Sequence, residues 1–144
     1  MGADLYMEKS YQKRMQKHIE ELDKLKDDNK QDEASTLLNY LHNNEVYFRD
    51  PYNSGNTLWA MNLSWWTDVL PMLDDQRFLG ESGILKLLSL IEKAPLHVSE
   101  DFLRDIPNEW TRSDAMKYIH ENRNKLIYFL NQSLLRKERI FCSL

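Results

Sequence analysis

The spacing of the apolar residues is the feature that most constrains the fold of this chain. Along most of its length, apolar side chains recur every three or four positions in a charged background, which is the pattern of an amphipathic helix. The pattern is clearest in residues 7–26, 84–91 and 116–134. In the first of these segments the apolar positions are Met7, Tyr11, Met15, Ile19, Leu22 and Leu25. We therefore predict an all-α fold.

Capping residues and prolines divide the chain into about five helices. After the first helix, the other four are expected from Asp32 to Asn43 or Asn44, from Asn56 or Thr57 through Trp66, from Glu81 or Ser82 to Pro95, and from Thr111 or Ser113 toward Arg139. A short turn of helix is expected from Ser99 through Leu103. The segment ending at Trp66 holds three of the four tryptophans, so we expect it to be central and largely buried. No repeat or glycine-rich linker occurs, and we predict a single helical domain over residues 1–144.

Strand signals are weak by comparison. The best are residues 5–7 and 46–48, and each is too short to build a sheet. The two segments could pair as one very short β-ribbon beside the helical bundle.

Composition places the protein among ordinary globular domains. A chain of 144 residues, 42% of them hydrophobic, can bury one core without a covalent staple. Cys142 is the only cysteine, which excludes an intramolecular disulfide, and we expect it at a frayed end of the chain. The N-terminus lacks the apolar stretch of a signal peptide, and no window reaches the ~18 apolar residues of a membrane span. We expect a cytoplasmic protein with no membrane partner.

The net charge of −4 is unevenly distributed along the chain. Residues 1–50 carry −3, residues 51–110 carry −5 and residues 111–144 carry +4. An acidic protein is a poor candidate for general nucleic-acid binding, which draws its affinity from many basic contacts to phosphate. A basic cluster at Arg136, Lys137 and Arg139 leaves nucleic-acid binding through the last helix as an alternative, although cations are also favoured at any helix C-terminus.

The stretch at residues 47–56 has the most unusual chemistry in the sequence. Proline, glycine, serine and asparagines favour an ordered loop, and tyrosines and a phenylalanine accompany them. Its charged, phenolic and amide groups could converge on a small polar ligand. The candidate ligand-binding residues are Asp4, Arg49, Asp50, Tyr52 and Asn53, with Trp65 as a wall. The alternative is an internal tether, in which Asp50 accepts backbone amides and Arg49 pairs with a carboxylate such as Asp4.

We predict no metal, no cofactor and no catalytic residue. Three histidines are followed three positions later by glutamate, but such pairs arise readily in a chain with 23 acidic residues. His120 and Glu121 begin a zinc-protease pattern that fails at Asn124, where the second histidine should stand. No phosphate-binding loop or dinucleotide motif is present.

These observations favour a protein-interaction or binding module without catalysis. The charged first helix, at about residues 7–28, has a narrow apolar stripe and could be an arm that docks on a protein partner or on a second copy of the chain. The alternatives are a polar-ligand binder or enzyme with its site at residues 47–56, and nucleic-acid binding through the last helix.

Three segments carry a resemblance to known sequences. The opening MGADLY, the segment YFRDPYN and the following NTLWAMNLSWW together resemble a group of small bacterial proteins of uncharacterised function. The resemblance covers about the N-terminal half of the chain. It implies a bacterial origin, and it implies that the start of the chain and the loop belong to one structural feature. It implies no activity and no catalytic residue.

Overall fold

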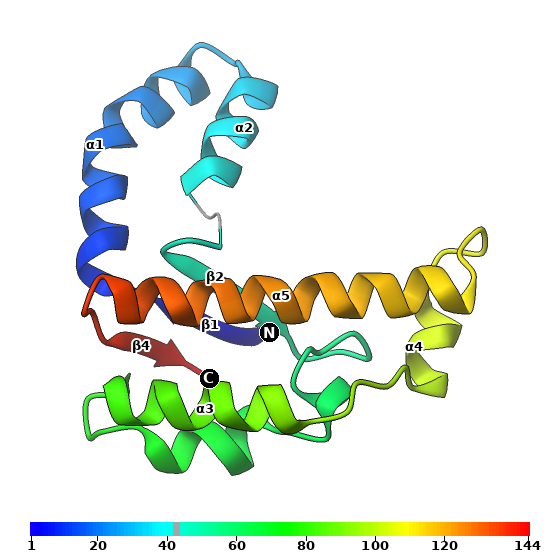
Figure 1. Cartoon of the computed structure of the whole chain (residues 1–144). Helices are drawn as coiled ribbons and strands as arrows, with labels where there is room; N and C mark the ends of the chain where they lie inside the picture. The colour runs from blue at the N-terminus through cyan, green and yellow to red at the C-terminus, as the bar shows by residue number, and fades with distance from the viewer. Residues whose placement is uncertain (42–43) are drawn as a thin grey trace.

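The chain folds into helices that surround a small sheet (Figure 1). The computed structural model describes residues 1–41 and 44–144. In chain order, the strands and α-helices are β1 (Gly2–Tyr6), α1 (Glu8–Asp27), α2 (Gln31–Leu41), β2 (Tyr47–Pro51), β3 (Phe78–Leu79), α3 (Glu81–Lys93), α4 (Glu100–Asp105), α5 (Arg112–Leu135) and β4 (Ile140–Ser143).

The four strands form one antiparallel sheet in the order β2-β1-β4-β3, so the predicted all-α fold is wrong. The two segments expected to form a ribbon do pair, with Leu5 opposite Phe48. β4 then pairs with the other edge of β1, which places Leu5 opposite Cys142. Strands this short are stable only in a sheet that packs on other elements, and their pairing partners lie far apart in sequence. Local periodicity therefore gave only the two weak signals in β1 and β2, and it missed β3 and β4.

Cys142 lies at the centre of the structure, and the prediction of a frayed end at this residue is wrong. It is fully buried on β4 between β1 and β3. Burial raises the pKa of its thiol to about 12. The thiol therefore stays protonated and unreactive while the protein is folded.

The core lies on the inner face of the sheet. Along β1, Ala3 and Leu5 are buried while Asp4 and Tyr6 point outward, and the other long strands alternate in the same way. α3 and α5 pack against each other, and α5 also packs on β2. The core they enclose includes the fully buried side chains of Trp65 and Phe129.

The predicted third helix does not form as a continuous helix. Residues Trp59–Met61 make a turn of 3-10 helix, Trp65–Val69 a π-helical turn and Leu70–Met72 a second 3-10 turn. Asn62 interrupts the segment because its backbone is left-handed, with φ of 57°, and the Ser64 hydroxyl then caps a new turn. Within this new turn, Trp65 is buried and Trp66 is exposed.

The remaining helices follow the sequence predictions closely. α3 and α4 form where expected, and the hydroxyl of Ser99 caps α4. α5 begins after Thr111, which makes a reciprocal capping box with Asp114. α2 extends from Gln31 to Leu41, and the predicted stop at Asn43 lies outside the described residues. No helix in the described part of the chain has the length and apolar character needed to cross a bilayer.

α1 and α2 form a hairpin, residues 8–41, that projects from the rest of the molecule (Figure 1). We call this hairpin the arm. A left-handed turn at Asn29 joins its helices, and Leu22 and Ala34 are buried between them. Ile19 is 49% exposed. The helix expected at about residues 7–28 is thus confirmed as α1, and its role in docking stays a prediction.

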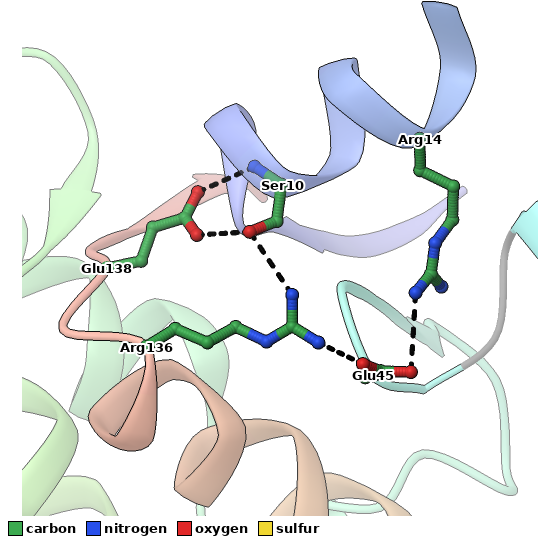
Figure 2. A network of polar contacts seen from close by, with 5 residues as sticks. All are labelled: Ser10, Arg14, Glu45, Arg136 and Glu138. Atoms are coloured by element: carbon green, nitrogen blue, oxygen red, sulfur yellow. Dashed lines mark hydrogen bonds and ion pairs between the residues drawn. The ribbon is translucent and has the colours of Figure 1, made fainter. Parts of the chain in front are cut away.

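A network of polar contacts fixes the base of the arm to the end of α5 (Figure 2). The Glu138 carboxylate accepts hydrogen bonds from the backbone N–H of Ser10 at 2.9 Å and from its hydroxyl at 2.5 Å. Arg136 and Arg14 both donate to the carboxylate of Glu45, in the turn before β2. The N-cap residue of α1 supplies no side-chain cap, so Glu138 takes that role from the far end of the chain.

Candidate functional site

Asp4 and Arg49 lie directly opposite each other on the outer face of the sheet, on β1 and β2. Arg49 Nη1 donates to both carboxylate oxygens of Asp4 at 2.8 Å. The hydroxyl of Tyr47 donates to the same carboxylate at 2.5 Å. The pairing proposed for the internal tether is therefore observed, and it engages both charges with each other.

Three tyrosines surround this ion pair, and the sequence analysis did not single them out as a cluster. The ring centroid of Tyr6 lies 5.0 Å from that of Tyr11 and 5.1 Å from that of Tyr47. Burial raises the pKa of all three hydroxyls, and for Tyr47 the hydrogen bond to Asp4 raises it further. Alternate residues of a strand share a face, so Asp4 and Tyr6 of one strand lie on the same face as Tyr47 and Arg49 of the strand paired with it. That spacing was the sequence signal for this part of the cluster.

Asp50 points to the opposite, inner face of the sheet and is 1% exposed. Its carboxylate accepts hydrogen bonds from the backbone N–H of Thr57 at 2.8 Å, from that of Leu58 at 3.3 Å and from the indole N–H of Trp65 at 2.8 Å. Burial raises the pKa of Asp50, and the three donors partly offset that effect. The role of Asp50 is to hold the chain that folds around it.

The loop at residues 51–58 is further closed by its own polar groups. The side-chain oxygen of Asn53 accepts from the N–H of Gly55, and the amide of Asn56 donates to the carbonyl of Pro51 at 2.8 Å. The N–H of Tyr52 donates to the carbonyl of Met1 at 3.1 Å. The start of the chain and this loop thus form one structural feature.

The six candidate residues do not converge on one cavity. Asp4 and Arg49 lie on the outer face of the sheet, whereas Asp50 and Trp65 are buried on the inner face. Of the six, only Asn53 lines any of the described pockets, and it lines two of them. The assignment of the six as ligand contacts stays a prediction.

Aromatic side chains form an exposed surface beside the loop, which we call the aromatic surface: Tyr52, Trp59 and Trp66. The Tyr52 ring stacks against Trp59, with centroids 6.1 Å apart and planes 25° apart, and it packs against Trp66 at the same distance. Trp59 is 42% exposed and Trp66 is 48% exposed. The sequence predicts that the segment holding Trp59, Trp65 and Trp66 is largely buried. For these three side chains the prediction is correct for Trp65 and wrong for Trp59 and Trp66.

A pocket of about 470 Å³ opens next to the aromatic surface, between residues 53–60 and α4. Trp59 forms one wall, Asp101 and Asp105 line the α4 side, and Phe102 and Ile119 contribute apolar surface. The Ser54 hydroxyl donates to Asp105 at 2.6 Å across the rim. Sequence analysis missed this pocket because its two sides are about 45 residues apart in the chain.

Residues that could hold a metal do not gather within the described part of the chain. Among residues 1–41 and 44–144, no three histidine, cysteine, aspartate or glutamate side chains are placed to bind a common ion. His18 contacts Glu21 at 3.3 Å on the surface of α1. The aromatic surface and the pocket beside it are therefore the candidate functional site.

Comparison of the chain with protein families, with curated proteins and with solved structures gives no match in any of the three.

Proposed function

We propose that this protein is an interaction module without catalysis, which binds a partner protein through the aromatic surface. The observation that carries the proposal is the exposure of Trp59 and Trp66, at 42% and 48%, with both rings packed against Tyr52. Tryptophan and tyrosine are enriched among the residues that dominate binding energy at protein interfaces, since they bury large rigid surfaces.

The backbone beneath the aromatic surface supports this proposal. Asp50 holds the N–H groups of Thr57 and Leu58, immediately before Trp59. Asn56 accepts from the N–H of Trp59 at 3.1 Å, and Ser64 caps the turn that carries Trp66. Because folding already orders these residues, binding costs little further conformational entropy.

The alternative interpretations draw less support from the same contacts. A polar ligand at residues 47–56 would compete with the internal partners of Asp4, Arg49 and Asp50. Nucleic-acid binding through the last helix would need basic side chains that can reach phosphate. Two of these side chains already have partners within the protein, because Arg123 donates to the carbonyl of Ile91 and Arg136 donates to Glu45.

Selection of peptides from a random phage-displayed library on the immobilised protein tests the proposal. We expect selected peptides to lose most of their binding to Trp66→Ser and to Trp59→Ser. Leu135→Ser is the matched control, because Leu135 is 75% exposed on α5, away from this surface. Peptides that bind all four proteins equally, or a selection that yields no binder, would overturn the proposal.

The arm is a second candidate surface, on the strength of the exposed Ile19. An arm that docks on a second copy of the chain predicts a dimer by light scattering at high protein concentration, and Ile19→Glu should return it to monomer. A monomer at every concentration would exclude the homodimer.

A further inference from the structure

The pocket beside Trp59 joins three kinds of surface that a single side chain rarely meets together. Phe102 and Ile119 give it apolar lining, Trp59 presents an aromatic ring, and α4 contributes the carboxylates of Asp101 and Asp105 on either side of Arg104 in the sequence. An occupant that satisfies all three has an apolar stem and a cationic head. Arginine fits this description, since its methylene stem packs on apolar surface while its planar guanidinium stacks on indole and pairs with carboxylate.

The carboxylates of the pocket are available to such an occupant. Asp105 is engaged through one oxygen, Oδ2, by the hydroxyl of Ser54, and its other oxygen has no partner among the described residues. Asp101 pairs with Arg104, which also lines the pocket, but the side chains of Asp101 and Arg104 are 72% and 74% exposed. A surface pair of this kind contributes little stability, so an incoming guanidinium can exchange with it at small cost.

The wider charge of this region favours a basic partner. Residues 51–110, which contribute the whole aromatic surface and all of the pocket lining except Ile119, carry a net charge of −5. Within the lining itself, Asp101 and Asp105 outnumber the single cation Arg104. Opposite charge on a partner increases the rate of encounter and disfavours acidic competitors.

We infer that the pocket receives an arginine side chain of the partner protein, while apolar residues flanking that arginine pack on the aromatic surface. The inference rests on the proposed function and adds the chemistry of the partner. Trp59 belongs to both the pocket and the aromatic surface, so the two contacts are adjacent.

The test uses two capped synthetic peptides, acetyl-Ala-Leu-Arg-Leu-Ala-amide and the same peptide with citrulline in place of arginine. Citrulline keeps the planar head and removes its charge. Tryptophan fluorescence of the full chain reports binding, because the peptides contain no tryptophan. We expect the arginine peptide to bind with a dissociation constant of about 0.1–1 mM and the citrulline peptide to bind at least about fivefold more weakly.

Variants then assign the charge effect to the pocket. Asp105→Asn should weaken the arginine peptide at least about threefold and leave the citrulline peptide unchanged. Asp75→Asn is the matched control, because it makes the same charge change at an exposed turn that does not line the pocket. It should alter neither affinity. A misfolded Asp105→Asn would weaken both peptides, which separates loss of structure from loss of the ion pair.

The outcomes separate this inference from the proposed function. Equal affinity of the two peptides, equal effects of the two aspartate variants, or no saturable signal up to about 5 mM arginine peptide would overturn the arginine pocket. The proposed function would survive any of these if library-selected peptides still required Trp66. The proposed function falls if the tryptophan substitutions leave those peptides bound, or if the selection yields no binder.

Discussion

The loop at residues 51–58 and the base of the arm are each held by a carboxylate that accepts backbone N–H groups, but in contrasting settings. Asp50 is 1% exposed, and its backbone donors lie seven and eight residues further along the chain. Glu138 is only partly buried, and its donor, the N–H of Ser10, is 128 residues away. Asp50 therefore orders a loop close to it in sequence, whereas Glu138 joins the two ends of the chain.

The contrast shows how burial changes the importance of the same interaction. Around Asp50, water cannot replace a lost acceptor, so every donor would be left unsatisfied at a cost of about 1–3 kcal/mol each. At Glu138, water can reach the freed N–H, and salt screens the charge. We therefore expect loss of the Asp50 carboxylate to lower the free energy of unfolding strongly, and loss of the Glu138 carboxylate to lower it only weakly.

Removing the Asp50 carboxylate gives the largest expected effect. Asp50→Ala leaves the N–H groups of Thr57, Leu58 and Trp65 without an acceptor in the interior, and we expect it to lower the free energy of unfolding by about 3 kcal/mol or more. Urea denaturation followed by tryptophan fluorescence measures the change. Asp75→Ala, at an exposed turn, is the control. A loss for Asp50→Ala as small as that of the control would show that the loop does not need this acceptor.

The pH dependence of stability gives an intermediate effect with a definite sign. Burial raises the pKa of Asp50 above 3.8, so the folded protein holds this proton more tightly than the unfolded chain does. Its contribution to stability is complete below pH 3.8 and declines as the pH rises through the raised value. Urea denaturation of wild type and Asp50→Asn from pH 3 to pH 7 should show the stability of wild type relative to the variant falling as the pH rises. A stability of wild type that rises with pH relative to Asp50→Asn would contradict this account.

Removing the Glu138 carboxylate gives the smallest effect. Glu138→Ala deprives α1 of its N-cap, and we expect a loss of about 1 kcal/mol that falls at high salt. Circular dichroism at 222 nm and urea denaturation, each at low and high salt, provide the measurement. Glu121→Ala, an exposed carboxylate on α5, serves as the reference. Identical behaviour of the two variants would mean that the arm is held by its other contacts alone.

Features set by neighbouring residues could be predicted from the sequence. α3, α4 and α5 follow from helical spacing and from caps such as Ser99 and Thr111. The acceptor role of Asp50 was one of the two alternatives for the loop because its backbone donors are close in sequence. These interactions are decided within a few turns of chain.

Features set by distant residues could not be predicted in the same way. β4, the cap from Glu138 and the pocket beside Trp59 each join segments far apart in the chain, and no local pattern reports such pairing. The exposure of Trp59 and Trp66 was missed for a different reason. Helical spacing was extended across Asn62, whose left-handed backbone ends the turn.

The pairing of β1 with β4 has a consequence for how the protein is made. Asp4 lies opposite Ser143, so the middle of the sheet joins residues almost 140 positions apart. On the ribosome, β1 therefore leaves the exit tunnel long before β4 exists, and until then one edge of β1 stays unpaired and open to other chains. Closing so long a loop also slows folding. The period between the synthesis of β1 and that of β4 is when this protein most needs a chaperone.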